Sequence, residues 1–371
     1  MVTSMKKFIK HNLIMLGFFC CIVGFMLIFI FGQKENRSIS ERRKLKEFPT
    51  FRVEAVQNHS YMEDVEAYLL DHFPFREHLR RLKAYFAYDV LGQLENNDIY
   101  MAEGYAGKLE YPLKEASVIK ATEKMQAIRE QYFPSAEVYY AIVPDKNYFL
   151  AERNGYPSME YNRLAVLMQE RLTNMTYIDI WDTLSIEDYY KTDTHWRQEC
   201  LEETVQRIGY VMGFSEYLSE DYQQGVIDEF YGVYYGQSAL PLSAEPLYYL
   251  TNETIQAATQ WSLETDKIQP IYRNEEEAGY DKYNIFLSGA QAVQRIESPL
   301  AKTENRLIVF RDSFGSSIIP LFLDAYKEII VIDTRYINPA FLGKYVDFET
   351  ENTQILFLYN TLLLNNSSML K

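Results

Sequence analysis

The sequence predicts an α/β domain with a mainly parallel sheet, preceded by one membrane-spanning helix. Two patterns support this fold class: an uncharged apolar stretch near the N-terminus, and short apolar segments that alternate with helical patterns through most of the remaining chain. The composition, with 47% hydrophobic and 24% charged residues, is typical of a folded globular protein. The 371 residues suffice for one large domain, or for a domain with appendages.

The apolar stretch at residues 13–31 contains no charged side chain. Its length is close to the roughly 20 residues that a helix needs to cross a bilayer, and three lysines lie just before it. Because positive charge is retained on the cytoplasmic side, we expect a cytoplasmic N-terminus at 1–12, a signal anchor at 13–32 and an extracytoplasmic remainder. The alternative is a cleaved signal peptide, but no small-x-small cleavage site follows the stretch.

A charged and polar stretch at 33–60 is predicted to be a stalk. Apolar side chains then recur at spacings of three and four up to about residue 94, which predicts helix. The aromatic and proline-containing block at 71–76 interrupts this pattern, and we expect a structural packing corner there, with a kink or break at Pro74. We expect the folded domain to cover 61–371.

Strands and helices are predicted to alternate through this domain. Continuous apolar segments predict buried strands, and apolar spacings of three and four predict helices. The predicted strands are 137–143, 177–180, 306–310, 328–332 and 354–358, and the predicted helices are 114–132, 161–174, 196–212 and 316–326. Alternation of this kind is typical of a largely parallel sheet with helical connections.

Residues 215–300 break the alternation. They are rich in Tyr, Gln and Glu, and their periodicity is weak. We expect an insertion, partly of β structure, between the two segments at 191–196 and 311–317 that contain the candidate catalytic residues.

The charge and cysteine content argue against several classes of partner and site. The net charge is −15, and apart from the run at 42–44 the chain lacks the clustered Lys and Arg that a nucleic-acid surface needs. Two of the three cysteines lie inside the apolar stretch, so neither a disulfide framework nor a cysteine-based zinc motif is predicted. We expect no nucleic-acid partner and no cofactor.

The first segment that could carry chemistry is Lys-Thr-Asp-Thr-His-Trp at 191–196. Asp193 precedes His195 by two positions at the expected start of a helix, which can place a carboxylate beside an imidazole. In acyl transfer such an imidazole takes the proton of a serine, while the carboxylate fixes its tautomer and stabilises the cation that forms. The alternative, preferred for this segment alone, is that Asp193 or Thr194 caps the helix and His195 is simply exposed.

The second segment is the predicted strand at 306–310, which runs directly into a polar turn at 311–317. Ser313 lies in this turn. Nucleophilic serines often lie after the carboxyl end of a strand, where backbone N–H groups can stabilise an oxyanion. The alternative is that Asp312, Ser313 or Ser316 caps a helix.

The distribution of histidines links the two segments. A nucleophilic serine needs a base, and the chain has five histidines. His11 precedes the apolar stretch and three others lie in the membrane-proximal region, so only His195 falls within the predicted α/β region. Too few histidines remain for a His-rich metal site with about three protein ligands, whereas a carboxylate-rich metal site stays open.

These segments resemble a known family. Asp-Thr-His-Trp at 193–196 resembles the motif that names the DHHW family of bacterial envelope proteins, with Thr194 in place of the first His. That position also reads Thr in the alginate O-acetylation proteins with an SGNH-hydrolase-like domain, which the chain resembles too. The other blocks that resemble the family are Arg37 with Pro49, the block at 71–76 and the block at 311–314.

The resemblance implies an SGNH-hydrolase-like three-layer domain with Ser313 as nucleophile, His195 as base and Asp193 as the orienting carboxylate. Most SGNH hydrolases place the serine block first and an Asp-x-x-His block last. Here the order is reversed and the Asp–His spacing is one residue shorter. The glycan O-acetylation relatives share the reversed order.

Four further residues follow predicted strands and are candidates for the same site. Asn147 and Asn360 are candidates for oxyanion contacts, and Arg335 and Tyr336 for binding an acyl donor or a sugar. For each of the four, a role in a turn or on the surface is the alternative.

From the resemblance we expect extracytoplasmic, serine-dependent acyl transfer, in particular O-acetyl transfer to a cell-envelope polysaccharide. A carbohydrate acetylesterase with the same three residues is the nearest alternative. A catalytically inactive glycan-binding or assembly protein is the alternative from another class. The expected partners are the envelope glycan and, by analogy with the relatives, an integral-membrane acyltransferase that supplies the acyl group.

Overall fold

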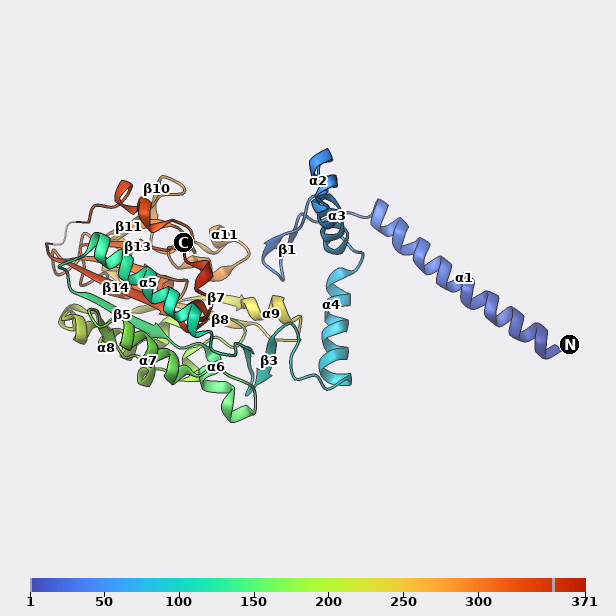
Figure 1. Cartoon of the computed structure of the whole chain (residues 1–371), viewed down its shortest axis with the longest axis horizontal. Helices are drawn as coiled ribbons and strands as arrows, with labels where there is room; N and C mark the ends of the chain where they lie inside the picture. Colours follow the sequence, from blue (N-terminus) through green and yellow to red (C-terminus); the bar gives the residue numbers. More distant parts are fainter. Residues whose placement is uncertain (1, 349–350) are drawn as a thin grey trace. The chain divides into compact units, whose positions relative to one another are not determined.

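The computed structural model describes residues 2–348 and 351–371 (Figure 1). The chain falls into two compact units. The first consists of Met1–Gln93 with Ala239–Pro241, and the second consists of Leu94–Ser238 with Leu242–Lys371.

The first unit begins with the long helix α1 (Val2–Phe31). Within α1, Asn12–Phe31 is apolar and long enough to cross a membrane, and among the residues that the structure describes it is the one span of this kind. The predicted apolar helix is therefore present. Its function as an uncleaved anchor, and the orientation of the chain across the membrane, stay predictions.

A short hairpin and three helices make up the rest of the first unit. They are β1 (Arg37–Ser38), β2 (Arg43–Lys44), α2 (Val53–Gln57), α3 (Ser60–Asp71) and α4 (Arg76–Tyr85), which continues as a π-helical segment (Phe86–Val90). The helical structure is interrupted around Pro74, between the end of α3 and the start of α4, as the sequence predicts. Phe75, directly before α4, has a left-handed backbone conformation with φ of 61°.

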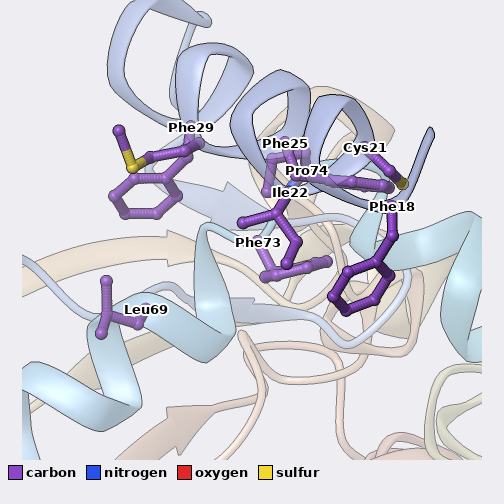
Figure 2. A pocket seen from close by; sticks show the side chains of 9 residues that line it. Phe18, Cys21, Ile22, Phe25, Phe29, Leu69, Phe73 and Pro74 are labelled. Atoms are coloured by element: carbon purple, nitrogen blue, oxygen red, sulfur yellow. The ribbon is translucent and has the colours of Figure 1, made fainter. Parts of the chain in front are cut away.

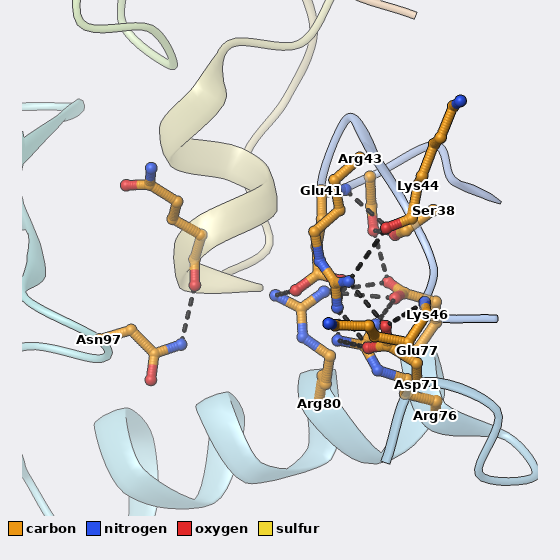
Figure 3. A network of polar contacts seen from close by, with 12 residues as sticks. Ser38, Glu41, Arg43, Lys44, Lys46, Asp71, Arg76, Glu77, Arg80 and Asn97 are labelled. Carbon is orange, nitrogen blue, oxygen red and sulfur yellow. Dashed lines mark hydrogen bonds and ion pairs between the residues drawn. The ribbon is translucent and has the colours of Figure 1, made fainter. Parts of the chain in front are cut away.

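A polar network joins the hairpin to the corner between α3 and α4 (Figure 3). The Asp71 carboxylate accepts hydrogen bonds from the Arg43 guanidinium at 2.8 and 2.5 Å and from the Lys46 backbone N–H at 2.8 Å. Arg76 pairs with Glu41 at 2.7 Å. The Arg43 guanidinium lowers the pKa of Asp71 to about 2. These contacts give the polar residues of the corner a structural role.

An eight-stranded sheet forms the centre of the second unit. In spatial order its strands are β10 (Lys267–Pro270), β9 (Thr259–Ser262), β11 (Val293–Glu297), β13 (Glu328–Ile332), β12 (Arg306–Arg311), β14 (Thr353–Asn360), β5 (Val138–Val143) and β6 (Thr176–Ile178). Neighbours from β13 to β6 run parallel, and neighbours from β10 to β13 run antiparallel. The predicted α/β fold with a mainly parallel sheet is confirmed. Three of the antiparallel strands, β9, β10 and β11, come from residues 215–300 and extend the sheet.

Two hairpins and nine helices complete the described part of this unit. The hairpins are β3 (Ile99–Ala102) with β4 (Tyr105–Lys108), and β7 (Gln223–Phe230) with β8 (Glu245–Thr251). The helices are α5 (Glu115–Tyr132), α6 (Lys146–Leu150), α7 (Tyr161–Arg171), α8 (Glu202–Met212), α9 (Val233–Ser238), α10 (Glu253–Ala257), α11 (Glu275–Ala278), α12 (Gly315–Ile318) and α13 (Thr361–Asn365).

Helices cover both faces of the sheet, because successive side chains of a strand point to opposite faces. On β12, Leu307 and Val309 pack in one core with α8, whereas Ile308 and Phe310 pack in a second core with α5 and α7. The same alternation runs along β5 and β14. The result is the three-layer arrangement that the resemblance implies (Figure 1).

Two predicted helices are markedly shorter in the structure, whereas the one predicted at 161–174 loses only its last three residues, since α7 ends at Arg171. The helix predicted at 196–212 begins as an α-helix only at Glu202, because Trp196 and Gln198 instead bond to the turn after β12. The helix predicted at 316–326 is reduced to α12 and a 3-10 turn, since Pro320 has no backbone N–H to continue the ladder. Asp193 therefore lies in an irregular loop and caps no helix.

Candidate active site

Ser313 lies in the turn between β12 and α12, at the carboxyl edge of the sheet. β12 lies between β13 and β14 and runs parallel to both, so the carboxyl ends of three strands meet here. The Asp312 carboxylate shapes the turn, because it accepts the Phe314 N–H at 3.0 Å and the Asn360 N–H at 2.7 Å. Burial raises the pKa of Asp312.

A buried arginine supports this turn. A β-carbon at Gly315 would lie 2.7 Å from the Cβ of Arg311, so glycine permits the close approach of the chain. The Arg311 guanidinium donates to the Gly289 carbonyl and the Gln294 side chain, both at 3.1 Å, and pairs with Asp333 at 3.6 Å. Desolvation lowers the pKa of Arg311. This side chain is fully buried and therefore acts from within the core.

His195 and Ser313 are 118 positions apart in the sequence, yet Nε2 of His195 lies 2.8 Å from Oγ of Ser313. The other ring nitrogen, Nδ1, lies 2.5 Å from Oδ1 of Asp193. An ionised carboxylate accepts hydrogen bonds and cannot donate them, so we assign the proton to Nδ1 and leave Nε2 to accept from the serine hydroxyl. The structure thus brings the three side chains together in one hydrogen-bonded chain.

Asp193 is fully buried and is held by main-chain groups. Its Oδ1 also accepts the His195 backbone N–H at 3.1 Å, and its Oδ2 accepts the Val233 N–H at 2.7 Å. The neighbouring Gly232 N–H donates to Thr192 Oγ1 at 2.8 Å. A β-carbon at Gly232 would lie 2.2 Å from the Thr192 carbonyl carbon, so only glycine lets the segment between β7 and α9 approach Asp193 this closely.

Glu245, the first residue of β8, holds the same loop. Its carboxylate accepts the backbone N–H groups of Lys191 and Thr192 at 2.8 and 2.7 Å, and the Thr192 hydroxyl at 2.7 Å. Gly232, Val233 and Glu245 all come from the predicted insertion, and none of them was predicted as a site residue from the sequence. No motif or periodicity in that stretch points to them, because their role depends on contacts with a distant loop.

Trp196 and Gln198 tie the loop that carries the histidine to the turn that carries the serine. The Trp196 indole N–H donates to the Phe314 carbonyl at 3.1 Å and to Ser317 Oγ at 2.9 Å. The Gln198 amide donates to the Ser317 carbonyl at 2.6 Å. These bonds account for the tryptophan of the Asp-Thr-His-Trp motif, since they fix the separation of the two segments.

Tyr283 stacks on the imidazole of His195, with ring centroids 3.8 Å apart and planes inclined by 7°. The Phe314 ring contacts the same imidazole at a centroid distance of 4.9 Å. The Tyr283 hydroxyl donates to Ser317 Oγ at 3.0 Å, which fixes the tyrosine in turn. One tyrosine among 31 carries no signal in the sequence, so this contact was not predicted.

Comparison with known proteins bears on the fold. No protein-family model and no curated protein matches the sequence. Among solved structures, a DHHW family protein from Eubacterium siraeum matches over 74% of this chain and 94% of its own, with 20% identity and a TM-score of 0.60. The two proteins share a fold.

Bacillus cereus PatB1 also matches this chain. Its structure aligns with 72% of this chain and 96% of its own, at 20% identity and a TM-score of 0.55. A structure of PatB1 with a sulfonyl adduct aligns with 72% of this chain and 95% of its own, at 19% identity and a TM-score of 0.55. At these identities the likeness concerns the fold, and at that level the resemblance to DHHW proteins is confirmed.

The two predicted asparagines lie in different surroundings. Asn147, in α6, accepts a hydrogen bond from the Tyr100 hydroxyl at 2.8 Å and donates to the Pro157 carbonyl at 3.4 Å, and an oxyanion contact for it stays a prediction. Asn360, at the end of β14, donates its amide to the Val143 carbonyl at 3.0 Å. Its backbone N–H binds the carboxylate next to Ser313, as described above, so Asn360 borders the serine turn.

Arg335 and Tyr336 follow β13 in the sequence. The Arg335 guanidinium is oriented by Asp333, with Nε and Nη2 at 2.9 and 2.6 Å from its two oxygens. Tyr336 is 50% exposed, and its ring centre lies 5.5 Å from the Arg335 guanidinium carbon. Both side chains are therefore placed by structural contacts, and a binding role for them stays a prediction.

The site contains the groups that serine-dependent acyl transfer requires: a hydroxyl, an imidazole nitrogen that accepts its proton, and a buried carboxylate on the opposite ring nitrogen. Across residues 2–348 and 351–371, no cluster of three or more His, Cys, Asp or Glu side chains is arranged to hold a metal ion.

Proposed function

We propose that this protein is an extracytoplasmic, serine-dependent O-acyltransferase that acetylates a cell-envelope polysaccharide. One observation carries the proposal: Asp193, His195 and Ser313 form a continuous hydrogen-bonded chain at 2.5 and 2.8 Å. Two independent helix caps would have no reason to meet at these distances. The choice of acetyl and of an envelope glycan follows the resemblance to glycan O-acetylation proteins.

In the first half-reaction, Ser313 Oγ attacks the carbonyl carbon of the acyl donor while His195 Nε2 takes the hydroxyl proton. The tetrahedral intermediate then collapses. The donor's leaving group departs with the proton from His195, and the acyl group stays on Ser313 as an ester. Asp193 stabilises the imidazolium that exists between these steps.

In the second half-reaction, His195 accepts the proton of an acceptor hydroxyl, whose oxygen attacks the acyl ester. The bond from Ser313 Oγ to the acyl carbon breaks, and the proton returns to Ser313. A sugar hydroxyl as acceptor makes the protein a transferase, and water makes it an esterase. The three side chains serve both reactions equally.

The negative oxygen of each tetrahedral intermediate needs hydrogen-bond donors. The Ser313 backbone N–H donates to no acceptor within the described part of the chain, and it is our candidate for one donor. Asn360 is the candidate for a second, because its amide keeps one hydrogen beyond that given to the Val143 carbonyl. Arg335 and Tyr336 remain the candidates for binding the acyl donor or the sugar.

The apolar segment Asn12–Phe31 supports a site of action at the membrane. In our proposal it is an uncleaved single-pass anchor, the N-terminus is cytoplasmic, and the remainder lies outside. An integral-membrane acyltransferase would then supply the acyl group from the membrane, and the envelope glycan would accept it.

The test uses the full chain purified in detergent, with 4-nitrophenyl acetate as acyl donor. Ser313→Ala should reduce ester hydrolysis by roughly 10³-fold or more, because no nucleophile remains. Ser135→Ala is the matched control, since Ser135 is exposed in the turn after α5, and it should keep wild-type activity.

Product analysis in the presence of a glycan acceptor identifies the reaction. Acetylated glycan as a product supports the transferase hypothesis. Free acetate as the sole product contradicts it and supports the esterase hypothesis. Hydrolysis that survives in Ser313→Ala, or full complementation of a gene deletion by that variant, would reject catalysis and favour the non-catalytic glycan-binding protein.

A further inference from the structure

The corner between α3 and α4 exposes large apolar side chains. Leu69, Leu70, Phe73 and Phe75 are 44, 62, 45 and 58% exposed. Clustered apolar exposure of this kind marks a surface that contacts something other than water. The polar network around Asp71 leaves these side chains unexplained, since it engages only the charged residues of the corner.

The corner lies beside the apolar part of α1. Phe25 of α1 stacks on Phe73 with ring centroids 5.6 Å apart, and meets Phe75 edge-on at 6.3 Å. Phe25 lies less than two helical turns before Phe31, where α1 ends, which corresponds to about 9 Å along the helix axis. Amphipathic elements bound to a membrane surface enter it by about 5–10 Å, so the depth of the corner fits such an element.

α1 and the corner enclose an apolar groove of about 470 Å³ (Figure 2). It is lined by Phe18, Cys21, Ile22, Phe25, Met26, Phe29, Leu69, Phe73 and Pro74. Its α1 lining, from Phe18 to Phe29, covers about 16 Å of helix axis, close to the thickness of one leaflet of a ~30 Å hydrocarbon core. No charged side chain lines it, so its chemistry suits a hydrocarbon chain.

Lys34, which follows α1 in the sequence, and Tyr68 of α3 both lie beside Phe29 in the last turn of α1. The Lys34 ammonium is 4.4 Å from the ring centre of Phe29 and 4.8 Å from that of Tyr68, and it donates to the Tyr68 hydroxyl. Lysine and tyrosine are among the side chains that bridge the apolar and aqueous layers at a membrane surface. An ammonium at this level can also meet a lipid phosphate.

We propose that the α3–α4 corner is a second membrane contact beside α1, and that the groove between them holds an acyl chain of a phospholipid. The proposal rests on the membrane-anchor part of the proposed function, because α1 sets the depth of the corner. Phe73 and Phe75 enter the outer boundary of the hydrocarbon layer, and Lys34 lies at the level of the phosphate.

The charge distribution along the chain suits this surface. Residues 33–94 carry 11 basic and 10 acidic side chains, whereas residues 95–371 carry 23 basic and 42 acidic ones. An anionic membrane would repel residues 95–371, because they carry a net negative charge. It would not repel residues 33–94, whose charges nearly balance. The basic residues of the chain are thus enriched where the corner would meet headgroups.

Fluorescence quenching in proteoliposomes tests the corner directly. The full chain, as the only protein, is reconstituted in phosphatidylcholine and phosphatidylglycerol brominated at acyl positions near the headgroup. Phe73→Trp should add tryptophan emission that these lipids quench almost completely. The matched control is Glu63→Trp, on the exposed polar side of α3, whose added emission should persist.

The wild-type chain supplies the background, since its three tryptophans all lie beyond residue 94. If the added emission of the two variants is quenched equally in vesicle-bound protein, the corner does not enter the membrane and the proposal is wrong. Water or another protein would then cover the corner. Failure of the wild type to float with the vesicles would overturn the anchor as well. Hydrolysis of 4-nitrophenyl acetate in the same samples tests the proposed function separately.

Native mass spectrometry of the detergent-solubilised chain tests the groove. Leu69→Trp places an indole in the groove and should remove the phospholipid that the wild type retains. Leu70→Trp is the control, because Leu70 is exposed but does not line the groove, and it should retain the lipid. Equal retention by the two variants would reject a lipid in the groove.

Discussion

His195 is held on three sides. Asp193 binds Nδ1, Ser313 lies at Nε2, and Tyr283 covers one face of the ring. Each contact removes a rotation or a tautomer that would be unproductive. A positioned imidazole is what proton transfer needs, because it is effective only within hydrogen-bonding reach of the hydroxyl.

Asp193→Asn tests the role of the carboxylate. We expect kcat for ester hydrolysis to fall by roughly 10³–10⁴-fold, because an amide neither selects the Nδ1–H tautomer nor stabilises the imidazolium. The measurement is kcat with 4-nitrophenyl acetate, together with the circular dichroism spectrum as a control of folding. Activity within tenfold of wild type would contradict the assigned role.

Lys146 is a second buried charge near the loop that carries His195. Its ammonium donates to the Tyr190 carbonyl at 2.9 Å and lies 4.9 Å from the ring centre of Tyr234. Burial lowers the pKa of Lys146 to about 7, because desolvation outweighs the attraction of nearby carboxylates such as Asp193.

This lowered pKa predicts a pH dependence of stability. In the unfolded chain the lysine pKa is about 10.4, so between pH 7 and that value the unfolded state binds more protons than the folded state. Stability should therefore rise with pH in this window, by on the order of 2–3 kcal/mol up to about pH 9.5. Lys146→Met should lack the rise.

The measurement for Lys146 is the free energy of unfolding by denaturant in detergent, followed by tryptophan fluorescence at several pH values. The difference between wild type and Lys146→Met isolates this group from other titrations. Parallel curves for the two proteins would show that the ammonium keeps an ordinary pKa in the fold.

At the scale of elements, the connection between β7 and α9 is what holds Asp193. It passes so close to the Thr192 backbone that glycine is needed at position 232, as the distances above show. The two strands β7 and β8 then bring Glu245 to the same loop. The insertion is therefore part of the site, and its conformation should control activity.

Gly232→Ala tests this contact. The added methyl would lie 2.2 Å from the Thr192 carbonyl carbon, so the connection must move away from Asp193. We expect ester hydrolysis to fall by roughly 10–100-fold, in line with the loss of positioning by an outer contact. Gly343→Ala is the control, because its methyl would meet Tyr132 at an ordinary 3.7 Å.

Rates are measured under the same conditions for both glycine variants, and thermal unfolding shows whether they fold. Equal activity of Gly232→Ala and wild type would mean that the connection does not set the position of Asp193. Loss of activity in the Gly343→Ala control would point to a general effect on folding.

At the scale of the whole molecule, the proposed function makes α1 the element that holds the site at the membrane. An uncleaved anchor predicts that the mature protein keeps residues 1–32 and resists extraction from membranes by alkaline carbonate, because about 20 apolar residues remain in the bilayer. Intact mass and carbonate extraction of the expressed protein measure this. A soluble product that lacks the apolar stretch would favour the cleaved signal peptide.

Much of the fold could be predicted from the sequence, because buried strands and helices produce apolar patterns among residues that are close in the sequence. β5, β12, β13 and β14 lie where continuous apolar segments were found, and α5 lies within a residue of its predicted start. The predicted start of a helix was wrong where tertiary contacts compete with helix formation, as at Trp196 and Gln198. Their side chains bond to a distant turn, and a local spacing pattern carries no trace of that contact.

The sequence by itself therefore determined the apolar helix, the alternating strands and helices, and the identity of Asp193, His195 and Ser313 as candidates. Only the tertiary structure decided that these three side chains meet, and that Tyr283, Gly232 and Glu245 hold them. The reason is physical. Secondary structure follows from neighbours a few positions apart, whereas a site built from two loops depends on which strands pair and on contacts between residues more than a hundred positions apart.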